Sequence, residues 1–499
     1  EAASLAGHLK LGKLIFFYDD NEISIEGDTD LAFTEDVGKR FEAYGWHVLQ
    51  LEDGNDVDAI DAAIQTAKAD DRPSLIICPT IIGYGLPTLA GTEKSHGAPP
   101  GEEELTAAKE SMDWPVEPKF YIPEDVLPIF RSALEQGEQA QRDWTDQLAA
   151  YAANYPEEAA EFKRRMAREL PEDWDKDLID FPADMEKGMA TRNASGSVIQ
   201  ELAARLPELI GGSADLAGST KTWIKNSPAF QADSPQGRNF HWGVREFAMA
   251  AAVNGLNLHG GVIGYGASFV VFSDYCRSAI RTAALSHIPS IFVFTHDSIG
   301  LGEDGPTHQP IEHLPSLRAM PNLNVVRPAD ANETAAMWKL ALRSKHNPTF
   351  FFLTRQKLPV FDRDEAACAC NAERGAYVLK DFGDDPEIIL MASGSEVQFA
   401  WEAAQVLHEE GTAVRVVSFP CWKAFEAQSQ DYKDSVLPPS VTKRVVVEAA
   451  YPMGWERYVG PEGKIIGISH FGASAPYQTI FQEFGITVEK VLEKARELL

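Results

Sequence analysis

The sequence predicts an α/β protein assembled from doubly wound domains, in which helices cover both faces of largely parallel sheets. Short apolar segments alternate with helical segments along nearly the whole chain, which is the pattern of repeated strand–helix units. The apolar segments are near-continuous runs of Ile, Val and Phe, as expected for strands buried on both faces. At 499 residues the chain is too long for one ordinary core, so we expect about two to four domains.

Segments with this strand character occur from the beginning of the chain to its last forty residues. They are Leu14–Tyr18, Ser74–Cys78, Ser290–Thr295, Thr349–Leu353, Ile388–Ala392, Val414–Phe419, Arg444–Val447 and Lys464–Ile468.

Two stretches interrupt the alternation and divide the chain. Ser132–Met185 is rich in Ala, Glu, Gln and Arg and has no strand pattern, so it is predicted to be a helical linker. Asp-rich sequence at Pro359–Asn371 separates two further α/β blocks. Ala2–Leu11 has the character of the middle of a helix, so the first block is predicted to be incomplete at its N-terminus. The predicted order is an α/β block over residues 1–131, a linker over 132–185, an α/β block over 186–360 and a last one over 361–499.

Composition excludes several classes of protein. The formal net charge is −30, and such a field repels nucleic acid and anionic membrane surfaces. No apolar run is long enough to span a bilayer, and the first residues do not resemble a signal peptide. The five cysteines have a spacing that suits neither zinc nor a disulfide framework, which favours thiols in a reducing cytoplasm. A site for a phosphorylated ligand would need local cations to offset the negative charge.

Two motifs in the first block have polar groups suited to a phosphate or a metal. Tyr18–Asp28 follows a predicted strand, and its Asn side chain and backbone carbonyls are hard ligands suited to Mg²⁺ or Ca²⁺. The alternative is an ordinary turn. His96 lies among Gly and Pro after Gly83–Gly85, where it could contact a phosphate or a substrate hydroxyl. The alternative there is a loop histidine without a function.

The second block contains the densest set of chemical groups. The loop Thr295–Pro310 has two His, two Asp and a Glu within thirteen residues of Gly-rich sequence, so its backbone can approach a ligand while its side chains exchange protons. The spacing matches none of the common zinc patterns. Phe269, Phe272 and Tyr275 have helical spacing, which is most simply a packed core, and a pocket for an aromatic cofactor ring is the alternative.

These motifs together resemble the transketolase family across essentially the whole chain. The resemblance is carried by His296–Gly300 with Glu303–His308, which is close to diagnostic. Gly211–Leu216 and Asp19–Ile25 agree with it and occur in the right order along the chain. It implies a diphosphate-binding domain, incomplete at its N-terminus, then a pyrimidine-binding domain and a C-terminal α/β domain. It also implies a homodimer with active sites at the subunit interface, thiamine diphosphate, and Mg²⁺ (or Ca²⁺ or Mn²⁺). The reaction would transfer a two-carbon ketol group from a ketose phosphate such as xylulose 5-phosphate, through a thiamine diphosphate carbanion. The acceptor would be an aldose phosphate of the ribose 5-phosphate or erythrose 4-phosphate type.

The resemblance also assigns roles to individual residues. Asn21 and the Ile23 carbonyl would bind the metal, and His96 would contact cofactor and donor sugar. Glu246 would face the cofactor's aminopyrimidine ring. Phe269, Phe272 and Tyr275 would form the pocket for that ring, and Asp215 would contact the cofactor or the other subunit. Substrate contacts would be made by Arg192, Ser219, His296, Asp304, His308 and Arg355. The catalytic residues would be His96, Glu246, His296 and His308.

Two departures from the family pattern matter. Phe247 follows the Arg-Glu pair where the family commonly has His, so we expect local repacking there. The family's Gly-Asp-Gly motif lies upstream of this chain's first residue, in about 150 absent residues, most of a domain's worth. We therefore expect the chain alone to bind cofactor poorly and to be inactive. The alternatives are a dihydroxyacetone synthase, which uses formaldehyde, and a truncated, non-catalytic remnant that binds a partner subunit.

Overall fold

The computed structural model describes residues 1–499, and these form two compact units. The first consists of Glu1–Ala160 with Gln231–Asp233, and the second of Glu161–Phe230 with Ser234–Leu499. Each unit is built of alternating strands and helices, as the sequence predicts. None of the helices is long and apolar enough to cross a membrane.

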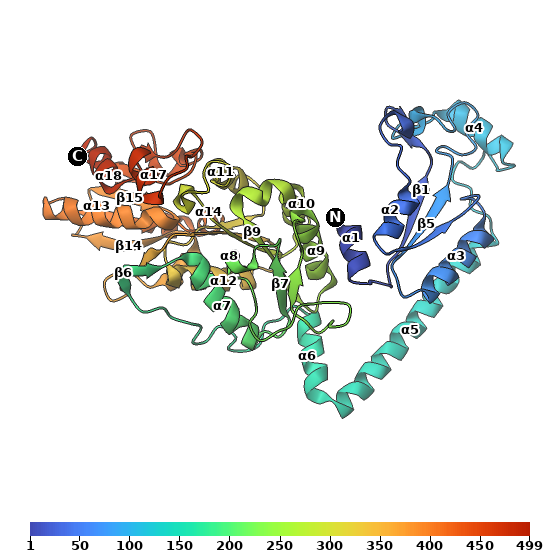
Figure 1. Cartoon of the computed structure of the whole chain (residues 1–499), viewed down its shortest axis with the longest axis horizontal. Helices are drawn as coiled ribbons and strands as arrows, with labels where there is room; N and C mark the ends of the chain where they lie inside the picture. The colour runs from blue at the N-terminus through green and yellow to red at the C-terminus, as the bar shows by residue number, and fades with distance from the viewer. The chain divides into compact units, whose positions relative to one another are not determined.

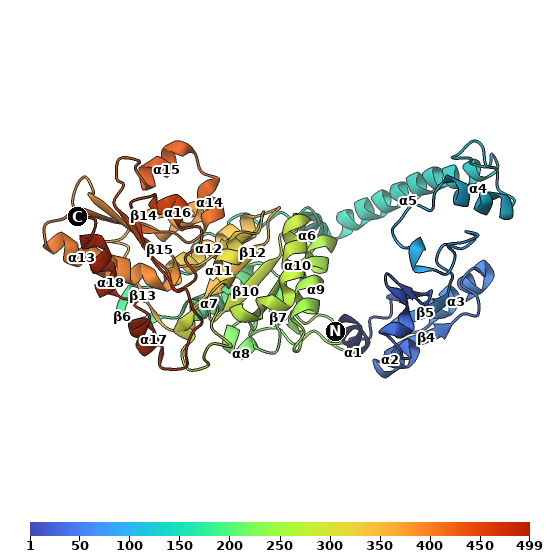
Figure 2. The ribbon, with the colours of Figure 1, turned by 90° about the horizontal axis from the view of Figure 1, so that it is seen from above.

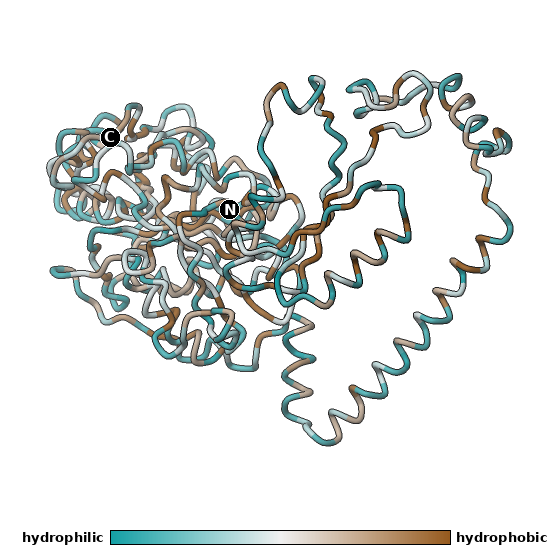
Figure 3. Tube along the Cα trace, turned by 45° about the vertical axis from the view of Figure 1, so that its right-hand side comes forward, coloured by the Kyte–Doolittle hydropathy of each residue, from teal (hydrophilic) through white to brown (hydrophobic).

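The first unit has a small parallel sheet of three strands in the order β1-β5-β4. Its elements are α1 Ala2–His8, β1 Ile15–Asp20, β2 Ile23–Ser24, β3 Gly27–Asp28, α2 Val37–Ala43, β4 His47–Gln50, α3 Val57–Ala69, β5 Ser74–Pro79, α4 Glu102–Ser111, α5 Val126–Asn154 and α6 Pro156–Met166, the last of which crosses into the second unit. The long helix α5 carries hydrophobic residues in alternation with hydrophilic ones along its length (Figure 3), and Phe130 and Trp144 on it are exposed.

One strand prediction in this unit is wrong in part. The apolar run of β1 was expected to be buried on both faces, but Phe16 and Phe17 are 50% and 51% exposed. The reason is its place in the sheet, because β1 is an edge strand that pairs only with β5. The central strand β5, by contrast, is buried along nearly its whole length.

The second unit contains a parallel sheet of six strands in the order β11-β12-β10-β9-β7-β8. Figure 1 shows α9 and α10 on one side of this sheet and α7 and α12 on the other. The elements are β6 Asp184–Met189, α7 Thr191–Arg205, β7 Leu209–Ser213, α8 Ala217–Thr220, β8 Asn239–His241, α9 Glu246–His259, β9 Ile263–Phe269, α10 Ser273–Leu285, β10 Ile291–Thr295, α11 His313–Arg318, β11 Asn324–Val326, α12 Ala331–Arg343, β12 Thr349–Leu353 and β13 Leu358–Val360.

The strands β7 and β9 were not among the predicted strands because they contain glycines. A Cβ on Gly266 would come 3.1 Å from Met249 of α9, so the missing side chain lets this helix pack closely on the sheet. Gly211 and Gly212 lie within β7 itself. A Cβ on Gly212 would come 1.8 Å from the Phe240 carbonyl oxygen of the neighbouring strand.

A second sheet of the same unit has five strands in the order β14-β16-β15-β17-β18, with β14 antiparallel and the rest parallel. Figure 2 shows α13 and α18 on one side of it and α14, α15 and α16 on the other. The elements are β14 Tyr377–Phe382, β15 Ile388–Ala392, α13 Val397–Glu409, β16 Val414–Ser418, α14 Trp422–Glu426, α15 Gln430–Val436, β17 Arg444–Val447, α16 Glu456–Val459, β18 Lys464–Ile466, α17 Tyr477–Glu483 and α18 Val488–Arg496. The fold is therefore doubly wound α/β in both large sheets, which confirms the predicted fold class.

The cysteines differ from the expectation in one respect. Cys368 and Cys370 are joined as a disulfide, although their spacing did not predict one. The backbone is extended at Cys368 and then enters a short 3-10 turn, which brings the two Cα atoms to 5.2 Å. Cys78, Cys276 and Cys421 are buried thiols, as expected.

Candidate functional site

The predicted groups of the second unit collect at one edge of the six-stranded sheet. His296 directly follows β10, Phe269 is the last residue of β9, and Arg355 lies two residues after β12. All these strands are parallel, so their carboxyl ends meet at the same edge, where ligands bind in open α/β sheets. We call this group of residues the carboxyl-edge site.

His296 is the most constrained residue of the site. Its side chain is only 3% exposed, and its backbone adopts a left-handed φ of 63°, which costs a residue other than glycine about 1–3 kcal/mol. Its Nδ1 lies 2.8 Å from the Thr295 hydroxyl oxygen. Burial, and then the positive charges of Arg192 and Arg355, lower the pKa of His296 from 6.5 to about 3. The imidazole is therefore neutral near pH 7.

Aromatic rings form one wall of the site. The rings of Phe269 and Phe272 are stacked, with centroids 5.9 Å apart and an angle of 10° between their planes. The Phe269 ring also lies 3.7 Å from the imidazole of His296, and Phe272 makes an edge contact of 5.5 Å with His308. The helical spacing was a misleading signal, because Phe269 ends a strand and α10 begins only at residue 273. Tyr275 is 69% exposed, so a packed-core role is wrong for it.

Glu246 is a buried carboxylate at the beginning of α9. The Ser268 hydroxyl, one residue before the end of β9, lies 3.4 Å from its Oε1 and donates a long hydrogen bond. The position at a helix N-terminus favours a negative charge, whereas burial opposes it. Phe247, the next residue, is half-exposed.

Two arginines are brought together by reciprocal threonine hydrogen bonds. The Thr191 amide donates to the Thr354 hydroxyl over 3.0 Å, and the Thr354 amide donates to the Thr191 hydroxyl over 2.7 Å. This links the beginning of α7 to the end of β12, and so places Arg192 near Arg355. Burial, and then the charge of Arg355, lower the pKa of Arg192.

The guanidinium of Arg192 is only partly satisfied. Its Nη1 donates to the Ser219 carbonyl oxygen over 3.0 Å, while its buried Nε has no hydrogen-bond partner. Two adjacent cations and an unused buried donor are suited to an anion with several oxygens.

The loop after β10 carries His308 and Asp304. The His308 Nδ1 lies 3.0 Å from the Thr307 hydroxyl, and Asp304 is exposed. Gln309 supports this loop, because its Nε2 donates to the carbonyls of Gly302 and Ala473 over 3.0 and 2.9 Å. Asp215, two residues after β7, is also exposed and has a left-handed φ of 60°.

Three family descriptions match this chain one after another. "Transketolase, thiamine diphosphate binding domain" matches residues 1–171, "Transketolase, pyrimidine binding domain" matches residues 187–360, and "Transketolase-like TK C-terminal domain" matches residues 375–487. This chain belongs to the transketolase family.

Individual relatives agree with this assignment. A transketolase of Geobacillus stearothermophilus is 51% identical over 502 residues, which are 100% of this chain and 75% of that protein. A transketolase of Bacillus subtilis (strain 168) is 50% identical over 504 residues, with the same coverage of both. The structure of a transketolase from Leishmania mexicana has a TM-score of 0.94 and 42% identity, covering 99% of this chain and 72% of that one.

Family membership implies thiamine diphosphate as the cofactor, and the residues of the site can be compared with its chemical groups. The carboxyl-edge site lies in the stretch that matches the pyrimidine binding domain, and its buried Glu246 and stacked Phe269 and Phe272 fit an aminopyrimidine ring. The residues present therefore fit this end of the cofactor.

The remaining predicted residues lie in the stretch that matches the thiamine diphosphate binding domain. Asn21 directly follows β1, and its Oδ1 accepts a hydrogen bond of 3.0 Å from the Ile23 amide. Ile23 begins the β2–β3 hairpin, so the motif is also the turn that was the alternative interpretation. His96 is exposed and ends a 3-10 turn. No group of three or more His, Cys, Asp or Glu side chains is placed to hold a metal ion.

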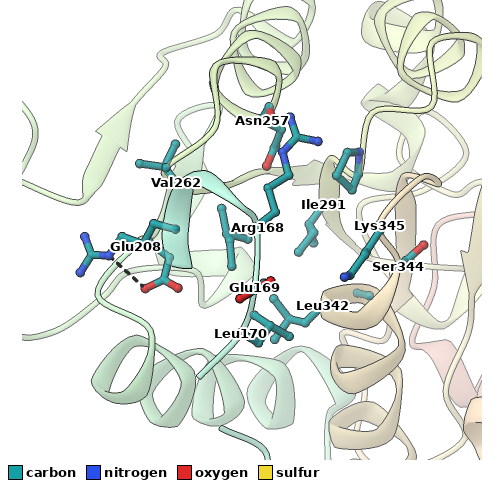
Figure 4. A pocket seen from close by; sticks show the side chains of 15 residues that line it. Arg168, Glu169, Leu170, Glu208, Asn257, Val262, Ile291, Leu342, Ser344 and Lys345 are labelled. Atoms are coloured by element: carbon teal, nitrogen blue, oxygen red, sulfur yellow. Dashed lines mark hydrogen bonds and ion pairs between the residues drawn. The ribbon is translucent and has the colours of Figure 1, made fainter. Parts of the chain in front are cut away.

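A separate pocket lies at the opposite edge of the six-stranded sheet (Figure 4). It is lined by Ile263 and Ile291, the first residues of β9 and β10, and by the buried Glu208, which accepts from Arg164 over 2.8 Å. Its accessible volume is about 60 Å³, and it contains none of the predicted site residues. This pocket is therefore separate from the carboxyl-edge site.

Sequence reasoning missed the residues that support the site from behind. Thr191 and Thr354 fix the arginines, and Arg327 contacts Asp297, the residue after His296. A polar residue directly after a strand was the available signal, because Arg327 follows β11 and Thr354 follows β12.

Proposed function

We propose that this transketolase-family chain transfers a two-carbon ketol unit reversibly between sugar phosphates at the carboxyl-edge site. The donor is a ketose phosphate of the xylulose 5-phosphate type, and the acceptor is an aldose phosphate such as ribose 5-phosphate or erythrose 4-phosphate. Family membership over the whole chain supports this reaction. When bound, thiamine diphosphate supplies an electron-accepting ring that stabilises negative charge on the transferred unit.

The observation that carries the proposal is the paired cations Arg192 and Arg355. Holding two guanidinium groups together at a partly buried site is unfavourable unless an anion joins them. The overall charge of −30 makes such local cations necessary for a phosphorylated substrate. In this proposal both arginines bind the substrate phosphate, and Ser219 contributes at the same end of the site.

Proton transfer is assigned to the buried groups beside the aromatic wall. Glu246 exchanges a proton with the aminopyrimidine ring nitrogen, while Phe269, Phe272 and Tyr275 form the pocket for that ring. His296 is neutral, and its Nδ1 is engaged by Thr295, so Nε2 remains to hydrogen-bond the donor sugar. His308 and Asp304 contact substrate hydroxyls, and Asp215 contacts cofactor or a neighbouring subunit.

Residues of the thiamine diphosphate binding domain hold the other end of the cofactor. Asn21 Oδ1 and the Ile23 carbonyl oxygen are hard oxygen ligands for Mg²⁺, or for Ca²⁺ or Mn²⁺. His96 contacts the diphosphate and the donor sugar. We further propose a homodimer in which this domain of one subunit completes the site with the pyrimidine binding domain of its partner, and a cytoplasmic location.

Calorimetric titration of thiamine diphosphate, with and without Mg²⁺, tests whether this chain of 499 residues forms the cofactor site. Tight binding that depends on Mg²⁺ supports the proposal, and sedimentation at the same cofactor concentrations tests the dimer. The absence of binding would favour the alternative of a non-catalytic, partner-binding remnant.

Substrate assays then test the phosphate end of the site. We expect Arg192→Gln and Arg355→Gln each to raise KM for xylulose 5-phosphate about tenfold or more, because each removes a charge-assisted hydrogen bond worth about 1.5–3 kcal/mol. An unphosphorylated ketose donor is the control, and its KM should change little. Equal effects on both donors would contradict the phosphate assignment, and efficient turnover with formaldehyde as acceptor would favour a dihydroxyacetone synthase.

A further inference from the structure

A buried ion cluster lies directly behind the carboxyl-edge site. Arg327 is only 1% exposed, and it follows β11 in the pyrimidine binding domain. Its Nε donates to Asp297 Oδ2 over 2.9 Å, and its Nη1 donates to Glu396, which lies in the stretch matching the C-terminal domain. Nη1 also donates to the Ser393 carbonyl oxygen over 2.7 Å, so Arg327 joins the two domains.

The guanidinium is fixed from several sides. Burial disfavours its charge, but Glu396 and Asp297 hold the pKa of Arg327 above its ordinary value. Gly394 has a left-handed φ of 59°, and a Cβ there would come 2.7 Å from the guanidinium carbon. Glu396 is held in turn by the Ala449 amide, which donates over 3.0 Å. The position of the cation is therefore restrained largely by residues of the C-terminal domain.

The position of Arg327 bears on His296 through Asp297. The two residues are consecutive, and the left-handed backbone of His296 needs neighbouring contacts that hold it in place. The Arg327 bond is the strongest contact of the Asp297 carboxylate, since Ser298 donates only a long hydrogen bond of 3.4 Å. A buried ion pair is often no more stabilising than apolar side chains of the same volume, so its benefit here is geometric.

We propose that Arg327 is a positioning residue for His296, which it holds through Asp297 while Glu396 of the C-terminal domain holds Arg327. The C-terminal domain thus acts on the geometry of the carboxyl-edge site through Arg327 and Asp297. This inference rests on the role proposed above for His296.

The chain contains a matched control for this proposal. Arg318 is a second buried arginine of the pyrimidine binding domain, and its Nη1 donates to Glu448 of the C-terminal domain over 2.7 Å. It also lies 4.1 Å from the centre of the Trp422 ring, but it has no contact with Asp297. Its Nη2 donates to the Ser393 hydroxyl over 3.2 Å, and Arg327 contacts the same serine. Arg318→Met therefore breaks a second link between the same domains while leaving the bonds from Arg327 to Asp297 and Glu396 in place.

The test compares Arg327→Met, Arg327→Lys and Arg318→Met by NMR of ¹³C-labelled histidine and by kinetics of the cofactor-loaded chain. We expect Arg327→Met to shift the His296 resonance, to raise its apparent pKa above about 3, and to lower kcat/KM at least tenfold. Arg327→Lys should keep the His296 resonance and kcat/KM closer to the parent values, because one ammonium can still bind Asp297. Arg318→Met should lower stability similarly while leaving the His296 resonance and kcat/KM within twofold of the parent.

Identical behaviour of the Arg327 and Arg318 variants in both measurements would overturn the proposal. If Arg327→Met does not fold, Glu396→Gln provides the same comparison, since it weakens the hold on Arg327 but keeps an acceptor. A different result would show that the proposed role of His296 in the reaction is wrong. In that case His296→Ala would leave turnover unchanged, whereas the His296 resonance would still shift in Arg327→Met.

Discussion

The six-stranded and three-stranded sheets contain strands of similar composition in different environments. The strand β10, Ile291–Thr295, is buried at every residue because it lies between β9 and β12 and has helices on both faces. The strand β1, Ile15–Asp20, is equally apolar at its start, yet Phe16 and Phe17 are half-exposed at the sheet edge. Apolar content therefore predicts that a segment is a strand, while its neighbours decide how deeply it is buried.

The same difference extends to the residues that follow these strands. His296 follows β10 and is buried, with an altered pKa and contacts to a ring and a hydroxyl. Asn21 follows β1 and makes one local hydrogen bond with Ile23. The carboxyl-edge site is thus held in place by tertiary contacts, whereas the proposed metal ligands are ordered by their own turn.

The largest expected effect is on kcat, and it comes from Glu246, the buried carboxylate of the carboxyl-edge site. We predict that Glu246→Gln lowers kcat about 10²–10⁴-fold, because the amide cannot exchange a proton with the cofactor. Steady-state kinetics with saturating thiamine diphosphate measure this, and Glu365→Gln on the exposed surface is the control. A loss of less than threefold would mean that Glu246 has no part in proton transfer.

A smaller effect, on the free energy of unfolding, compares a buried strand of the six-stranded sheet with the edge strand of the three-stranded sheet. We predict that Phe351→Ala, in the fully buried β12, lowers the free energy of unfolding by about 3–5 kcal/mol. Phe16→Ala, at the exposed edge, should lower it by only about 1 kcal/mol, since half of the ring is already in water. Hydrogen exchange of the strand amides, read separately for each sheet, provides the measurement. Equal losses would show that edge and centre are equally packed.

The smallest expected effect is on the pH dependence of stability. The unfolded chain protonates His296 below its ordinary pKa of 6.5, but the folded chain does so only near about 3. The unfolded state therefore binds more protons between these values, and the stability contributed by neutral His296 is lost as pH falls through this window. We predict that His296→Gln flattens the fall in urea midpoint between pH 6.5 and pH 4. An unchanged slope would show that other groups dominate it.

Much of the site could be read from the sequence, because its residues directly follow strands. Predicted bounds for β12, β15 and β17 agree with the structure, since these strands are continuous apolar runs. The strands β7 and β9 could not be recognised, because their glycines make room for a helix and a neighbouring backbone that no local pattern reveals. The left-handed turn at His296 was equally invisible from local preference.

By itself, the sequence determined the α/β alternation, the family and the chemical groups available at the carboxyl edge. Strand periodicity and motif order are properties of the sequence itself, so they can be recognised without a structure. Only the tertiary structure decided which groups are buried, that Arg192 lies near Arg355, and that Arg327 joins Asp297 to Glu396. These contacts connect residues 30 to 163 positions apart, and electrostatic effects depend on distance and burial in space rather than on spacing along the chain.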